Sequence, residues 1–164
     1  METKTLETLF VDTLKDIYYA ERQIMKALPK MARAAKAPEL KAAFTMHRQE
    51  TEGQVERLQQ IFELLGKRAQ GKTCPAIDGI LDEGSELMDE YKDSPVLDAA
   101  LAAAAQAVEH YEMARYGTLS SWAGILGYDK ATALLEATLQ EEKNADQKLS
   151  AVAEAVNPVA MAAE

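Results

Sequence analysis

The chain has 164 residues, of which 48% are hydrophobic, enough apolar material for one domain with a substantial core. Its formal net charge of -9, from 27 acidic and 18 basic residues, argues against nucleic acid and anionic membrane as partners, because both bind basic surfaces. A single cysteine, Cys74, excludes an internal disulfide and any cysteine-based zinc or iron-sulfur site.

The first part of the chain predicts two long helices. Helix-forming residues dominate and apolar residues recur at intervals of three and four, whereas strand signals are nearly absent. The spacing predicts a helix over residues 5–35 and a second over residues 38–65. Pro38 suits the first turn of the second helix, and Gly66 can cap its end.

A turn-rich connector follows over residues 66–94. It offers one short amphipathic helix within residues 80–91, which we expect Gly84 to interrupt. Ser94 and Pro95 then predict the N-cap and first residue of a third long helix, and a glycine at position 127 should end it.

A fourth helix is predicted to begin at Asp129 and to end at Asn157-Pro158. We therefore expect one domain over residues 1–157 and a flexible tail over residues 158–164. Short turns make each helix pair antiparallel, and the connector is long enough to cross a bundle about 40 Å in length. The pattern predicts an all-α, ferritin-like antiparallel four-helix bundle with one long crossover that contains a short helix.

Carboxylates interrupt the apolar face of every predicted long helix. They are Glu21 on the first, Glu50 on the second, Glu109 and Glu112 on the third, and Glu142 and Asp146 on the fourth. In both helix pairs the glutamates lie about 15 residues, or roughly 22 Å, from the joining turn, so they fall near mid-height. Because the two pairs point in opposite directions, only residues at mid-height can share one level.

Several carboxylates in one buried layer repel each other, so they either take up protons or bind cations. Bridging carboxylates can hold two divalent ions, and a shell of oxygen ligands favours iron or manganese over copper or zinc. We therefore predict a two-metal site. The alternative for any single glutamate is a solvated helix face or an ion pair, with Arg22, Arg48, Arg57 and Arg115 as available partners.

Other polar residues at a similar height have more than one interpretation. His47, one turn before a predicted ligand, can bind metal, hydrogen-bond a ligand or serve a structural role. His110 points about 100° away from the preceding glutamate, which disfavours contact with metal. Tyr18, Tyr19 and Tyr111 can hydrogen-bond the carboxylates, relay electrons or pack in the core.

We also expect a soluble protein of the reducing cytoplasm. The first ten residues lack a basic segment followed by a long apolar stretch, and no window approaches the roughly 18 uncharged apolar residues of a membrane span.

Four segments resemble the YciF/YciE family of bacterial stress-induced proteins, over about residues 6–152. They are IYYAERQ, HRQETEGQVERL, AVEHYEMARYGTLSSWAGILGY and LEATLQEEKNADQKL. The resemblance implies a ferritin-like, usually homodimeric protein with the helix arrangement of rubrerythrin. It also implies di-metal ligands at Glu21, Glu50, Glu109, Glu112 and Glu142.

The chain departs from the ferritin-like pattern at two positions. Such sites carry a histidine three residues after the glutamate on the second and fourth helices, where this chain has Gly53 and Ala145. Gln54 and Asp146, each one residue further on, can substitute. The resulting shell is almost all oxygen, which argues against ordinary ferroxidase or catalase activity.

The sequence leaves catalysis open between two functions. In the first, two iron or manganese ions react with peroxide or oxygen during stress, which makes the protein a redox enzyme. In the second, the bundle is a structural or protective stress protein, and metal only stabilises it. A third function, iron storage, requires a large cage rather than a dimer.

Overall fold

The computed structural model describes residues 3–162, which form five α-helices and, within that range, no strand. The helices are α1 (Leu6–Ala34), α2 (Pro38–Leu64), α3 (Pro75–Glu90), α4 (Leu97–Ile125) and α5 (Asp129–Ala162). None of these helices combines the length and hydrophobicity that a bilayer crossing requires. The predicted all-α class is confirmed.

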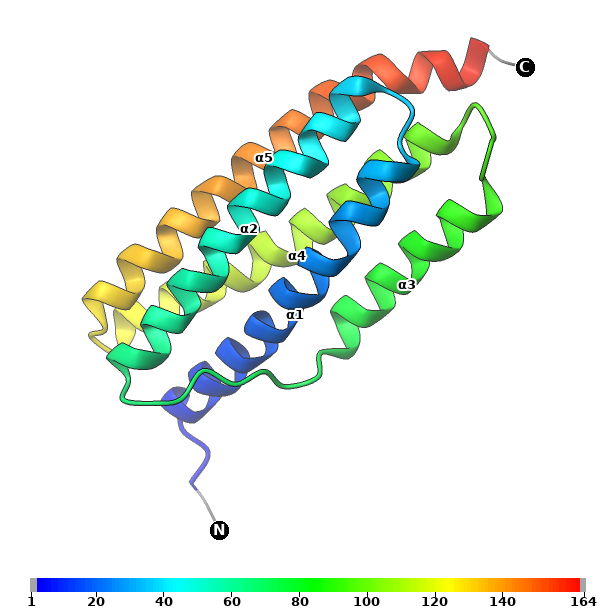
Figure 1. The fold of residues 1–164 in the computed structure, drawn as a ribbon. Coiled ribbons are helices and arrows are strands. Elements are labelled where there is room, and N and C mark those ends of the chain that lie inside the picture. The colour runs from blue at the N-terminus through cyan, green and yellow to red at the C-terminus, as the bar shows by residue number, and fades with distance from the viewer. Residues whose placement is uncertain (1–2, 163–164) are drawn as a thin grey trace.

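Four long helices make an antiparallel bundle, and α3 lies along its side against α1 and α4 (Figure 1). α1 and α2 form one hairpin, and α4 and α5 form the other. The turns of the two hairpins lie at opposite ends of the bundle (Figure 1). The segment between α2 and α4, which includes α3, is the long crossover. The arrangement is the ferritin-like bundle expected from the connection lengths.

Local sequence signals account for three of the helix ends. Thr5 caps α1, because its Oγ1 accepts from the Thr8 amide at 3.2 Å while Thr8 Oγ1 accepts from the Thr5 amide at 2.8 Å. Gly66 and Gly127 follow α2 and α4 with φ of 65° and 76°, a left-handed conformation that glycine adopts without steric cost. Both glycines were predicted to end their helices.

The crossover helix differs from the expectation. α3 begins at Pro75 and passes through Gly84 without interruption. Gly84 is buried, and a Cβ atom there would lie 3.6 Å from the Ala104 Cβ, an ordinary van der Waals distance. The packing of α3 on α4, rather than a steric need for glycine, therefore compensates for the low helix propensity of this residue.

The third long helix also begins later than predicted. Ser94 Oγ accepts from the Val96 amide at 3.3 Å, but residues around Pro95 form a turn and the helix starts at Leu97. The prediction that Ser94 and Pro95 are the N-cap and first helical residue was wrong. A serine hydroxyl that bonds two residues ahead stabilises a turn as readily as a helix start.

The last helix continues beyond the predicted stop. α5 runs through Asn157-Pro158 to Ala162, so the expected end at Asn157 was wrong. Proline removes one backbone donor, and the carbonyl it leaves unpaired, four residues earlier at Glu154, belongs to an exposed residue that water can reach. Of the tail expected over residues 158–164, residues 163–164 lie outside the described part of the chain.

Candidate metal centre

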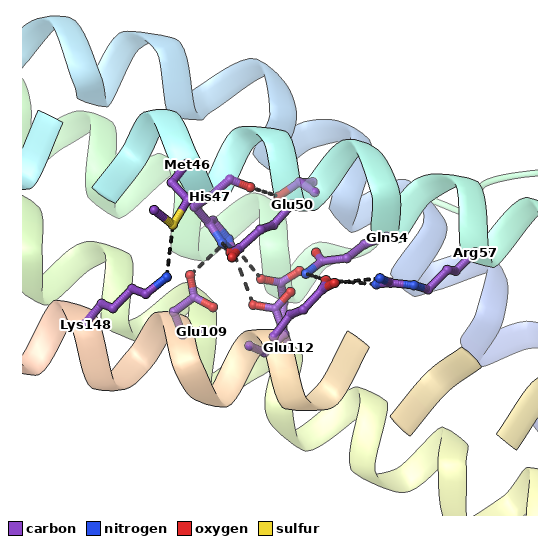
Figure 2. Close-up of polar contacts among 11 residues, drawn as sticks. Met46, His47, Glu50, Gln54, Arg57, Glu109, Glu112 and Lys148 are labelled. Atoms are coloured by element: carbon purple, nitrogen blue, oxygen red, sulfur yellow. Dashed lines mark hydrogen bonds and ion pairs between the residues drawn. The ribbon is translucent and has the colours of Figure 1, made fainter. Parts of the chain in front are cut away.

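Four ionisable side chains from three helices meet inside the bundle. His47 comes from α2, and Glu109 and Glu112 come from α4 (Figure 2). Glu142 comes from α5. One potential ligand atom from each residue lies within 4.8 Å of the others. Their exposed fractions are 6%, 2%, 0% and 0%, respectively. We call this group, together with Glu21, the carboxylate layer.

The apolar residues around them explain why these polar side chains are buried. Glu142 lies seven residues from both Leu135 and Leu149, which are 1% and 4% exposed. Positions seven apart lie on nearly the same face of a helix, so the two leucines turn the glutamate inward when they pack. His47 occupies the equivalent place after Leu40 on α2. Packing of the core thus forces the polar groups together.

The imidazole of His47 lies among several carboxylates. Its Nε2 atom is 3.0 Å from Glu109 Oε1, 3.8 Å from Glu112 Oε2 and 3.9 Å from Glu142 Oε2. On the other side of the ring, Nδ1 is 3.6 Å from Glu50 Oε2. The ring therefore contacts carboxylates through both nitrogens (Figure 2).

The first helix contributes Glu21, which is 0% exposed. Its Oε1 atom accepts a hydrogen bond of 2.5 Å from the hydroxyl of Tyr116, a residue that is also fully buried. Burial raises the pKa of Glu21 well above its ordinary value, and the nearby carboxylate of Glu112 raises it further. All four bundle helices therefore contribute to one layer.

The pKa shifts of the other residues indicate that the carboxylate layer holds protons and shares them. Burial raises the pKa of Glu142 well above its ordinary value, and the Glu112 carboxylate adds to this shift. Burial also opposes ionisation of Glu109, but its close contacts with the carboxyl group of Glu142 and the imidazole of His47 outweigh burial and lower the Glu109 pKa. For His47, burial lowers the pKa, yet its carboxylate neighbours outweigh burial and raise it well above the ordinary value.

Unpaired polar atoms are concentrated in this part of the molecule. Among the described residues, nine buried side-chain nitrogen and oxygen atoms lack a hydrogen-bond partner; they belong to Glu21, His47, Gln54, Glu109, Glu112 and Glu142. Each such atom costs about 1–3 kcal/mol when left unsatisfied in a protein interior. Carboxylate oxygens and an imidazole nitrogen are also ligands of divalent iron and manganese, so these residues fit a metal site.

Two predicted ligands lie at the margin of the layer. Glu50 has a side chain that is 25% exposed and contacts only the outer nitrogen of His47. Gln54 is fully buried; its Nε2 donates to Glu141 Oε2 at 3.1 Å, and its Oε1 has no partner. Arg57 donates to both oxygens of Glu141, at 2.8 and 2.6 Å (Figure 2). The arginine and glutamate thereby fix the amide of Gln54.

Asp146 and His110 are not part of the four-residue group. Asp146 Oδ1 lies 3.1 Å from His110 Nε2 and accepts from Gln106 Nε2 at 3.3 Å. The side chains of Asp146 and His110 are 21% and 66% exposed. Four residues beyond Glu142 correspond to a rotation of about 40° around the helix, and this brings Asp146 to the contact with α4.

The three predicted tyrosines make contacts elsewhere in the bundle. Tyr18 accepts from Gln59 Nε2 at 3.3 Å, and Tyr19 donates to Asp78 at 2.9 Å. The hydroxyl of Tyr111 lies 2.9 Å from the thiol of Cys74. These contacts join helices and the connector.

Tyr116, which sequence reasoning missed, is the tyrosine that reaches the layer through Glu21. It follows Glu112 by four residues and therefore lies on the same helix face, a signal that was available in the sequence.

Comparisons with known proteins agree on one family. Residues 5–161 match the family described as "Domain of unknown function (DUF892)". Protein YciF of Escherichia coli K12 is 46% identical over 154 residues, or 93% of each chain. The crystal structure of the E. coli stress protein YciF matches with a TM-score of 0.91 at 44% identity and covers 95% of this chain and 99% of that one.

A second solved structure, YcfI from Rhodopseudomonas palustris, is described as a proposed structural protein. It matches with a TM-score of 0.88 at 52% identity and covers 90% of this chain and 94% of that one.

Proposed function

This chain belongs to the DUF892 family and is a relative of the stress protein YciF, and from this premise we propose that it is a metal-binding stress-response protein. The observation that carries the proposal is the set of nine unpaired polar atoms buried in the carboxylate layer and in the adjacent Gln54. Native protein interiors contain few such atoms, and a bound ligand is one of the ways in which a cluster of them is satisfied. Divalent cations meet that requirement and neutralise the mutual repulsion of the carboxylates.

The proposed ligands divide into two groups. One ion takes ligands from His47, Glu109, Glu112 and Glu142, the four residues whose ligand atoms converge. A second ion requires Glu21, whose pKa is raised first by burial and then by the adjacent Glu112 carboxylate. Glu50, Gln54 and Asp146 are further candidates that would complete a ligand shell after small side-chain movements.

The donor set favours iron or manganese, since oxygen ligands dominate and cysteine is absent from the layer. When bound, such ions supply one-electron redox chemistry toward peroxide or oxygen. The chain's own residues orient the ions, exclude water and hold protons, with Tyr116 donating to Glu21 at 2.5 Å.

We extend the proposal to a cytoplasmic homodimer that does not bind nucleic acid. Light scattering tests the oligomeric state, because a mass far above that of two chains of 18.0 kDa would indicate a storage cage.

A structural or protective role is the second candidate, and the description of the YcfI relative favours it. In this role the ions bind the same residues and only stabilise the bundle. The two candidates differ in turnover. Metal-loaded protein that consumes neither peroxide nor oxygen in the presence of a reductant would support the structural role.

Elemental analysis of protein prepared without an affinity-tag metal tests the metal site. After reconstitution with iron(II) or manganese(II), we expect up to about two ions per chain, the number that bridging carboxylates commonly hold. Glu142→Gln should lose most of the metal. Glu136→Gln is the matched control, because Glu136 is an exposed residue of the same helix. Less than one ion per wild-type chain would reject the proposal.

A further inference from the structure

An apolar cavity of about 30 Å³ lies beside the carboxylate layer. Side chains from all five helices form its wall, including Ile24, Leu28, Phe44, Leu81, Val108 and Leu149. His47, Glu50 and Glu109 line it as well, so the cavity ends at residues of the candidate metal centre. It is therefore a space from which a small molecule could reach that centre.

The chemistry of the wall selects the kind of molecule that fits. A space of this volume can hold a water-sized molecule. Although His47, Glu50 and Glu109 lie in the wall, almost all of the surface that faces the cavity is apolar, so water finds few hydrogen-bond partners there, and such cavities stay dry and take up apolar gases. Hydrogen peroxide would lose the hydrogen bonds of its two hydroxyl groups to water against the same apolar surface, at similar cost. Dioxygen is small enough for this space. Because it is apolar, it loses no hydrogen bonds when it leaves water.

The route to solvent lies between α2 and α5. Of the residues that line the cavity, Met46 and Lys148 are exposed. Lys148 Nζ lies 2.9 Å from Met46 Sδ, so these two exposed lining side chains contact each other (Figure 2). Both are long and flexible, and they can separate without disturbing the packed core.

We propose that this cavity binds dioxygen next to His47 and Glu109. The inference rests on the proposed function and deepens it, because it names dioxygen rather than peroxide as the oxidant that reaches the metal centre. The binding step itself requires only the cavity. It can therefore be measured without turnover and without iron or manganese.

Dissolved dioxygen is paramagnetic and speeds the relaxation of methyl groups that it contacts, which provides a direct measurement. The full-length protein is kept diamagnetic with zinc or a chelator, and methyl relaxation is recorded under dioxygen and under nitrogen. We expect a larger oxygen effect at Leu28, Val108 and Leu149 than at Leu119. Leu119 is a suitable reference because it is fully buried and does not line this cavity.

Two cavity-filling variants show whether the effect belongs to this space. Ala105 is a buried lining residue on α4, and Ala105→Leu should abolish the extra relaxation at the lining methyl groups. Ala107→Leu is its control, because Ala107 is exposed on the same helix. Ala43→Leu fills the cavity from a less buried position on α2 and remains informative if the first variant fails to fold.

Three results would overturn the inference: equal relaxation at the lining and reference methyl groups, an unchanged effect in a folded cavity-filling variant, or shifts of the same methyl groups on addition of hydrogen peroxide. Its failure is distinguishable from failure of the proposed function. Metal uptake without oxygen binding would remove the cavity proposal alone. Oxygen binding without metal uptake would reject the metal proposal and retain the gas site.

Discussion

Tyr116 is the residue whose hydroxyl donates directly into the carboxylate layer. Tyr116→Phe removes the 2.5 Å hydrogen bond to Glu21 in a fully buried environment. We expect the metal-free protein to lose about 1–3 kcal/mol of unfolding free energy, because an acceptor is left unsatisfied. The pKa of Glu21 should also rise further, since this bond lowers it. Urea unfolding and carboxyl NMR titration measure the two effects.

Tyr18→Phe is the matched control for this change. Tyr18 is also buried, but its hydroxyl only accepts a 3.3 Å bond from the exposed Gln59. Its loss should change stability by less than about 0.5 kcal/mol, as is usual where water can replace the partner. Equal losses in the two variants would show that ring packing, rather than the bond to Glu21, determines the Tyr116 effect.

The release of protons on metal binding provides a second test of the individual residues of the layer. The pKa values of Glu21, Glu142 and His47 are all raised, so the metal-free layer holds protons at pH values where isolated glutamates have lost them. Metal ligands must be deprotonated, so binding should release protons, and metal affinity should increase as pH rises toward the raised pKa values. Calorimetry in buffers of different ionisation enthalpy measures the release. Affinity that is independent of pH would contradict a protonated layer.

Sequence reasoning located the layer better than it assigned the orientation of individual side chains. Glu109, Glu112 and Glu142 do converge, because seven-residue and three-residue spacing fixes their place relative to the apolar faces. The role of His47 at the centre of the group could not be chosen from spacing alone. Which partner a long side chain meets depends on helix rotation and on the neighbouring helix, as Asp146 and its contact with His110 show.

Between helices, Arg57 and Glu141 join α2 to α5 beside the layer. Arg57→Lys loses the paired hydrogen bonds of 2.8 and 2.6 Å, because an ammonium group lacks the planar fork of a guanidinium. We expect a loss of about 1 kcal/mol in unfolding free energy, since both side chains are about one quarter exposed. Metal affinity should fall as well, because Glu141 then holds Gln54 less firmly.

Arg48→Lys tests whether any arginine on α2 would give the same result. Arg48 contacts Glu52 on its own helix, with both side chains nearly half exposed, so the change should be close to neutral. Chemical denaturation and metal titration of both variants decide the question. An Arg57→Lys protein with wild-type metal affinity would show that the link between α2 and α5 does not position the layer.

For the helices themselves, existence was easier to predict from the sequence than the residues at which they begin and end. Long apolar periodicity identified all four bundle helices, and Gly66 and Gly127 marked two ends correctly. The errors arose where tertiary contacts or solvent override local preference. Gly84 stays helical because α3 packs closely on Ala104, and the helix tolerates Pro158 because the carbonyl that it leaves unpaired is near solvent.

For the whole bundle, the two opposed hairpins restrict where one site can form. Their turns lie at opposite ends, so mid-height is the level that central residues of all four helices share (Figure 1). The fold places Glu112 there beside carboxylates from α1 and α5, whose pKa values it raises. Such a layer opposes folding when metal is absent and supports folding when metal is present. The same substitution should therefore have opposite effects in the two states.

Glu112→Gln is the substitution that separates these states. In metal-free protein it removes charge repulsion and should leave the unfolding free energy unchanged or raise it by about 1 kcal/mol. Metal at a hundredfold excess over Kd should stabilise wild type by about 2.7 kcal/mol, and the variant should lose most of that gain. Urea unfolding with and without manganese measures both, with Glu136→Gln as the neutral control. A variant destabilised in both states would instead make Glu112 a structural partner of His47, since metal would then contribute nothing to its effect.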